Sequence, residues 1–152
     1  MKWPWSKEEI NGHGACPTYL YRWTLLRSPW TCIYLHHFVG NDWSRDFHDH
    51  PKRFISIGLK GEYIEETPYV NRYMFDHMHA EIKTYHAPWI RSFAATHAHR
   101  ICAIDCWTLV IVGPKTREWG FWHKDPTAPG RWIPWNVYVN DPNIVEKVKA
   151  CD

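Results

Sequence analysis

The chain has 152 residues and 45% apolar residues, which suits one compact domain with a hydrophobic core. Its 18 Lys and Arg oppose 16 Asp and Glu, giving a net charge of +2, with no basic block or acidic tail of the kind found in nucleic-acid partners. No apolar run approaches the roughly 20 residues of a membrane-spanning helix, and the start MKWPWSKEEI lacks the apolar core of a signal peptide. We therefore expect one cytoplasmic domain over residues 1–152, with no nucleic-acid or membrane partner.

The cysteines are odd in number and irregularly spaced, which argues against a disulfide framework or a zinc ribbon. We expect reduced thiols at all five: Cys16, Cys32, Cys102, Cys106 and Cys151. Eleven Trp and eleven His indicate an aromatic-walled protein rich in potential ligands.

The first half of the chain predicts two hairpins. Residues 18–26, TYLYRWTLL, alternate between two sets of side chains and read as a strand with two different faces. The turn SPW leads to a β-branched and aromatic return strand at 31–39. Residues 54–60, FISIGLK, read as a further strand, which a turn at Gly61 connects to EYIEETPYV.

The second half predicts more short strands and one helix. Strands fit EIKTYH, RICAI, CWTLVIVG and REWGFW, with a turn at residues 113–115. In DPNIVEKVKA, Asp141 suits a helix N-cap and Pro142 the first helical position, so a helix is expected at 141–150. Many short strands separated by turns are typical of an all-β sandwich or barrel, here over residues 18–139.

His48 and His50 are spaced for a shared ligand. Residues two apart on a strand point to the same face, so two imidazoles can reach one metal ion from inside a barrel. The context favours this pair, because an apolar strand and Gly61 follow it. Chance is the alternative in a chain with eleven histidines, and two further pairs have the same spacing: His77-x-His79 and His97-x-His99.

The segment from His48 to Gly61 resembles the first motif of the cupin superfamily, which reads H-x-H, three or four residues, E, six residues, G. The geometry matches, but Phe54, or Ile55 on the other count, stands at the Glu position. The second motif is resembled more loosely by the segment from Pro88 to His99, without its Gly and Asn. His99 is the third ligand that the resemblance implies, with His97 as its competitor.

Small cupin-like proteins of bacteria and phages, mostly of unknown function, are similar in a further respect. In their sequences an HDHP segment is followed by WTL, GP and WGF segments, and the same three segments occur here between residues 107 and 121. The resemblance implies an antiparallel cupin-type β-barrel, a double-stranded β-helix or jelly roll, with a short C-terminal helix.

The implied metal site has three neutral imidazoles, His48, His50 and His99, and open positions for water or substrate, as is usual in catalytic sites. Some cupins with this ligand set, the thiol dioxygenases among them, hold Fe(II), so Fe(II) is the first choice, with Zn, Ni, Cu or Mn as alternatives. A carboxylate could join the ion from elsewhere in the chain. The three candidates are Glu62, Glu65 and Asp105.

Two neighbours of the histidines are considered for supporting roles. Asp49 lies between the pair and would face away from the ion, orienting a loop or pairing with Arg45 or Lys52. Arg100 follows His99 and could act in catalysis by clamping a substrate carboxylate or phosphate, although an exposed or ion-paired Arg is the simpler interpretation.

Two functions remain at this stage. The first is a metal-dependent enzyme acting on a small polar or anionic molecule, of the oxygenase type or of the isomerase, epimerase or lyase type. The second is a binding cupin that holds a ligand or partner, with a structural or vestigial histidine cluster. Phosphate-binding loops, dinucleotide fingerprints and serine-hydrolase elbows are absent from the sequence. A homodimer is left open.

Overall fold

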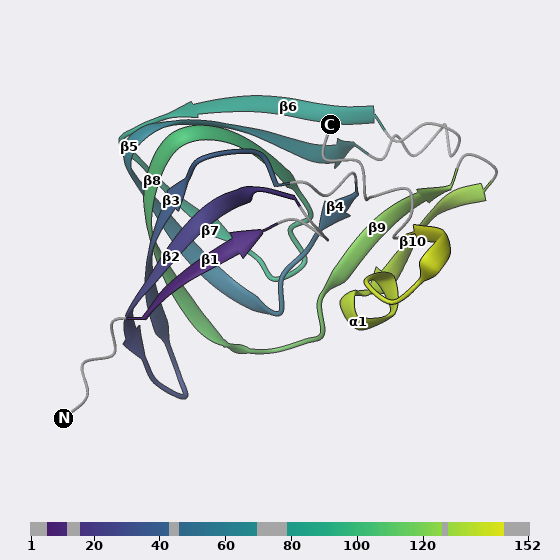
Figure 1. Ribbon diagram of the computed structural model, residues 1–152, viewed down its shortest axis with the longest axis horizontal. Helices are drawn as coiled ribbons and strands as arrows, with labels where there is room; N and C mark the ends of the chain where they lie inside the picture. Colours follow the sequence, from purple (N-terminus) through teal and green to yellow (C-terminus); the bar gives the residue numbers. More distant parts are fainter. Residues whose placement is uncertain (1–5, 12–15, 43–45, 70–78, 126–127, 145–152) are drawn as a thin grey trace.

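The computed structural model describes residues 6–11, 16–42, 46–69, 79–125 and 128–144, which form two antiparallel sheets (Figure 1). The large sheet has seven strands in the order β1-β2-β3-β8-β5-β6, with β7 also paired to β5, and the small sheet has the order β10-β9-β4. The strands are β1 Lys7–Asn11, β2 Thr18–Arg27, β3 Cys32–Phe38, β4 Phe47–His48, β5 Lys52–Tyr69, β6 His79–His86, β7 Trp89–Phe93, β8 Arg100–Lys115, β9 Gly120–Asp125 and β10 Ala128–Pro134.

The large sheet is strongly curved, and the long strands β5 and β8 bend with it (Figure 1). Its two faces differ as the alternation in the sequence predicts. Leu20 and Thr24 of β2 are buried on the inner face, whereas Trp23 stacks on Trp107 of β8 on the outer face, with ring centroids 5.6 Å apart. The all-β fold class is thus confirmed, and the strands expected at 18–26 and 31–39 correspond to β2 and β3.

The hairpin expected at Gly61 is wrong, because β5 continues through this residue. Gly61 has φ 79° and Asp105, nearby on β8, has φ 52°, so both strands bulge at the same level. A Cβ at Gly61 would lie 2.3 Å from the Asp105 carbonyl oxygen, so only glycine fits there without a shift of the backbone. The bulges bend the paired strands and keep them hydrogen-bonded.

The strands expected at RICAI and CWTLVIVG are one strand, β8, for the same reason. The turn expected at 113–115 is also wrong, since β8 runs to Lys115 and the chain turns only afterwards. Three observed strands were not expected, β1, β7 and β10. β1 is charged and β7 is only five residues long, so neither carries a strong local strand signal.

Helical structure is confined to the end of the described chain. The short helix α1, Trp135–Tyr138, was not expected; it packs Tyr138 on Phe121 of β9 with ring centroids 4.0 Å apart. Residues 142–144 are helical, and Asp141 Oδ1 accepts a hydrogen bond from the Asn143 amide at 2.9 Å, as expected of an N-cap. The remainder of the expected helix, 145–150, lies outside the described residues.

The cysteines differ from expectation at one position. Cys16 is disulfide-bonded, so the expectation of five reduced thiols is wrong, while Cys32, Cys102 and Cys106 are free. Nothing in the odd, irregular cysteine spacing indicated this bond. Within the described part of the chain, no helix has both the length and the apolar character needed to cross a membrane.

Candidate metal centre

Two segments about fifty residues apart meet through a backbone bridge. The amide of His48, at the end of β4, donates to the His99 carbonyl at 3.0 Å, and the His99 amide donates to the His48 carbonyl at 3.0 Å. His50 lies beyond β4, and its amide is held by the Ala95 carbonyl at 3.0 Å. Backbone hydrogen bonds therefore position all three histidines, independently of contacts between their side chains.

The imidazoles of His48, His50 and His99 converge on one point. Their ring centroids are 4.9 to 5.3 Å apart, and one nitrogen from each lies within 4.8 Å of the others. The Nε2 atoms of His50 and His99 are 3.0 Å apart. Two nitrogen ligands about 2.1 Å from one ion are separated by about this distance when the angle between them is near 90°. This donor set fits a divalent transition metal ion.

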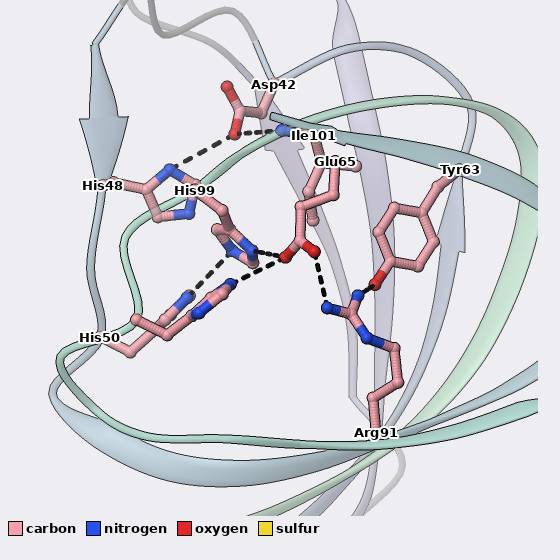
Figure 2. Close-up of polar contacts among 9 residues, drawn as sticks. Asp42, His48, His50, Tyr63, Glu65, Arg91, His99 and Ile101 are labelled. Carbon is pink, nitrogen blue, oxygen red and sulfur yellow. Dashed lines mark hydrogen bonds and ion pairs between the residues drawn. The ribbon is translucent and has the colours of Figure 1, made fainter. Parts of the chain in front are cut away.

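Buried carboxylates orient two of these imidazoles (Figure 2). His99 Nδ1 donates to Glu65 Oε1 at 2.7 Å, and His48 Nδ1 lies 3.3 Å from Asp42 Oδ2. A proton held on Nδ1 by a carboxylate leaves Nε2 unprotonated as a metal ligand, and it also fixes the plane of the ring. Glu65 is 2% exposed and Asp42 7%, so both pairs are shielded from water.

Glu65 accepts three donors on its two oxygens. His97 Nε2 donates to Oε1 at 2.9 Å, beside His99. Arg91 Nη2 donates to Oε2 at 2.6 Å (Figure 2). Burial by itself raises the pKa of the Glu65 carboxyl, but hydrogen bonds from His97, His99 and Arg91 outweigh it and hold the pKa well below its ordinary value. Glu65 is thus ionised at neutral pH.

Burial keeps the central imidazoles neutral, which is the form that binds metal. It lowers the pKa of His50 well below the ordinary value, with the neighbouring imidazoles adding to the effect. Burial also lowers the pKa of His99 to about 4, although Glu65 acts in the opposite direction. With His99 Nδ1 protonated, His50 Nε2 donates to His99 Nε2, and a metal ion would replace that shared hydrogen.

Phe54 occupies the place where the cupin motif has its Glu. Its ring meets His50 edge to face, with centroids 4.7 Å apart, and stacks on Phe93 at 4.5 Å. An apolar ring therefore lies against the histidines on this side. Ile55, the other candidate for the motif position, is 40% exposed.

The other carboxylates considered from the sequence lie elsewhere. Glu62 pairs with His86, and the exposed Asp105 pairs with Lys60 and His37. Asp49 faces away from the imidazoles, as expected. Its buried carboxylate accepts hydrogen bonds from the described groups Arg117 Nη1, the Gly120 amide and Trp132 Nε1, and so ties the histidine segment to β9 and β10.

Arg100 points to a different neighbour from the one expected. Its Nε donates to Glu66 Oε2 at 3.1 Å, Nη2 contacts the same oxygen, and the guanidinium carbon lies 5.5 Å from the centre of the Phe47 ring. Successive residues on a strand face opposite sides, so His99 and Arg100 diverge. Arg100 is not among the described residues that line the cavity at the histidines.

A cavity of about 500 Å³ opens onto the three imidazoles. Its walls are mostly apolar and aromatic, with Phe54, Phe93 and Trp119 near the histidines. This volume lies in the range of small-molecule sites. Asp42 and Arg22, which also line it, were not singled out from the sequence, because nothing in their local sequence distinguishes them from ordinary loop and strand residues.

Comparisons with known proteins support the fold. No family model matches the chain, and no curated protein matches its sequence. Among solved structures, KdgF from Halomonas sp. is similar with a TM-score of 0.51 and 10% identity, over 73% of this chain and 89% of that one. The Fe(II)-HppE structure with the alternative substrate (S)-1-HPP has a TM-score of 0.52 and 12% identity, over 74% of this chain and 58% of that one. A single-residue variant of the oxalate decarboxylase of Bacillus subtilis has a TM-score of 0.50 and 13% identity, over 73% of this chain and 28% of that one.

The chain spans most of KdgF but less than two thirds of the other two chains. Identities of 10 to 13% show a common fold and nothing finer. The bent antiparallel sheets and the histidines that meet across β4 and the start of β8 agree with that result. The protein therefore has the cupin fold, a double-stranded β-helix with a short C-terminal helix.

Proposed function

We propose that this protein is a metal-dependent enzyme that holds one divalent transition metal ion on His48, His50 and His99 and acts on a small polar or anionic molecule. One observation carries the proposal. Buried carboxylates hold the Nδ1 atoms of His48 and His99, so that their Nε2 atoms are available beside His50 at a cavity of about 500 Å³. Such preparation of neutral imidazoles is what metal binding requires.

The ion, when bound, supplies Lewis acidity and open coordination positions. The chain's own residues account for the rest of the chemistry. Asp42 and Glu65 keep the imidazoles in one tautomer, while Phe54 and Phe93 exclude water from the neighbouring wall. Because its three direct ligands would be neutral, an ion there would carry no charged ligand of its own, and its open positions would favour a substrate with a negative or strongly polar group.

Fe(II) is our first choice of metal, with Zn, Ni, Cu or Mn as alternatives. The donor set of three imidazoles suits each of them. The similar HppE structure is an Fe(II) form, which supports iron as the first choice. The proposal covers both the oxygenase type of reaction and the isomerase, epimerase or lyase type.

A second function, a binding cupin without catalysis, is favoured by Phe54. The aromatic ring fills the position of the motif carboxylate, so one ligand of the usual set is missing. A cavity of this size would still hold a ligand. In this alternative the histidine cluster is structural or vestigial, and the purified protein contains no stoichiometric metal.

Metal analysis of the purified protein separates the two functions. The enzyme proposal predicts about one transition metal ion per chain in the wild type, lost in His50→Ala and retained in His86→Ala, whose exposed imidazole pairs with Glu62. Metal-loaded protein is then screened against small thiols, keto acids and sugar phosphates, following oxygen uptake and product formation. Turnover that is equal in wild type and His50→Ala would contradict the proposal.

Four further expectations stay predictions. The role of Arg100 as a substrate clamp is tested by Arg100→Ala in the same screen. A homodimer is tested by light scattering of the purified chain, and a cytoplasmic location by cell fractionation. Absence of nucleic-acid binding is checked by titration with oligonucleotides.

A further inference from the structure

A row of polar side chains crosses the inner face of the large sheet. In the strand register, Arg22 of β2 lies opposite His36 of β3, and His36 lies opposite Thr108 of β8. Gly58 of β5 is the next member of the row. The three polar side chains all line the cavity that opens onto the histidine cluster. Polar groups on an inner barrel face require an explanation, since apolar residues are the usual occupants.

Arg22 retains donors for a ligand. Its Nε donates to His36 Nε2 at 3.0 Å, and its nearest described carboxylate, Glu8, lies 3.8 Å from Nη1 and also pairs with Arg27 at 3.6 Å. That contact is long and partly exposed, so it compensates little of the charge. Burial, and then the Arg22 charge, lower the pKa of His36 well below its ordinary value, so His36 adds no charge of its own.

Thr108 provides an independent sign of a missing partner. Its side chain is 2% exposed, and its Oγ1 atom has no hydrogen-bond partner among the described residues. A buried hydroxyl without a partner destabilises the folded protein, because it has lost its hydrogen bonds to water. Because Thr108 lines the cavity beside His36, a ligand in the cavity can supply the partner.

The row is separated from the histidine cluster by the length of a small molecule. Phe54, which contacts His50, lies four residues from Gly58 on the same strand. At about 3.3 Å per residue this corresponds to at most about 13 Å, since β5 is bent, and residues of both groups line the same cavity. One molecule can therefore contact both ends of the cavity.

We infer that Arg22, His36 and Thr108 bind the oxyanion group, a carboxylate or a phosphate, of the molecule that this cavity accepts, at the end remote from His48, His50 and His99. The planar guanidinium fork suits both groups. The inference rests on the proposed function for the reacting end of the substrate, but anion binding itself requires no metal. It assigns the anion to Arg22, whereas Arg100 is engaged by Glu66.

Calorimetric titration of chelator-treated protein with inorganic phosphate and, separately, with propionate tests the inference. We expect the wild type to bind at least one of them, and the tighter of the two identifies the group. Arg22→Gln should weaken binding about tenfold or more, as loss of a charge-assisted hydrogen bond would. Arg22→Lys, which keeps the charge and loses the fork, should be intermediate. Arg27→Gln, on the same strand and also beside Glu8, should bind as the wild type.

Thr108→Val adds a readout that a purely structural role would not give. Valine keeps the shape and removes the hydroxyl, so anion affinity should fall several-fold while the thermal midpoint of the ligand-free protein stays the same or rises. A lower midpoint with unchanged affinity would show that the hydroxyl supports the fold and would overturn its assignment to the anion.

His50→Ala distinguishes this inference from the proposed metal site. If Arg22, His36 and Thr108 bind the anion, anion binding to the metal-free protein should survive His50→Ala. Binding that disappears in that variant, or that appears only with added metal, would place the anion on the ion and overturn the inference while supporting the metal site. Wild-type affinity in Arg22→Gln, loss of binding in Arg100→Ala alone, or no binding of either anion to the wild type would also overturn it.

Discussion

Replacing Glu65 by Gln tests how the carboxylate prepares the metal ligands. The side chain keeps its shape but has one acceptor oxygen in place of two. If the amide oxygen faces His97 and His99, the amide NH2 meets the donor Arg91 Nη2, which lies 2.6 Å from Oε2 in the wild type. If the amide is turned over, the NH2 meets the His99 Nδ1 hydrogen, and the tautomer with a free Nε2 is no longer favoured.

The structure sets the size of the Glu65→Gln effect. Loss of a carboxylate that orients a ligating imidazole lowers metal affinity about 10- to 100-fold. The unfolding free energy of the metal-free protein should fall by about 3–5 kcal/mol at neutral pH, because the Arg91 charge is left without its buried partner. The two quantities are measured by metal titration against a competing chelator and by urea unfolding followed by Trp fluorescence.

Glu66→Gln is the matched control. Glu66 is the next residue of β5, and it pairs with the partly exposed Arg100. Removal of this carboxylate should leave metal affinity unchanged and cost at most about 1 kcal/mol of stability. Equal metal affinities in Glu65→Gln and the wild type would refute the reasoning that Glu65 fixes His99 for metal binding.

Three further predictions concern the motif position, the bulge and pH. Phe54→Glu should raise metal affinity on the order of tenfold by adding a charged ligand beside His50, and the same chelator competition would show no gain if position 54 does not face the ion. Gly61→Ala should destabilise by about 1–3 kcal/mol in urea unfolding, because φ is positive and the Asp105 oxygen is 2.3 Å from the new Cβ, whereas Gly113→Ala, with its closest contact at 3.5 Å, should change little. The metal-free protein should lose stability as pH falls from about 6.5 towards 4, because His99 stays neutral in the folded state but is protonated in the unfolded state. His99 alone should lower the unfolding free energy by about 3 kcal/mol over this range. Urea unfolding curves that do not change between these pH values would contradict the prediction.

Local alternation predicted the strands whose two faces differ. Alternation along residues 18–26 places Arg22 and Thr24 on the face opposite Trp23, and this is the division between the inner and outer faces of β2. The prediction failed at Gly61, because a glycine between apolar runs is equally typical of a turn and of a bulge. Only the pairing of β5 with β8 across the bulge distinguishes the two.

The histidines could be predicted, but the hydrogen-bonding roles of Glu65 and Asp42 could not. His48, His50 and His99 stand in recognisable motif positions. Glu65 is an odd number of residues from Phe54, so simple alternation places the two on opposite faces, yet both lie beside the histidines. The register shifts between Gly58 and Glu62 turn the strand over, and they depend on tertiary pairing. Asp42 lies in a loop whose position is set by its hydrogen bonds to Ile101.

X-ray absorption of the metal-loaded protein tests the central claim most directly. We expect about one ion per chain with three imidazole nitrogens at about 2.1 Å, falling to two nitrogens in His50→Ala. The same spectrum should be obtained from His86→Ala, whose imidazole is exposed and paired with Glu62. A protein that retains no ion after dialysis, or an ion whose spectrum lacks imidazole scattering, would contradict the account.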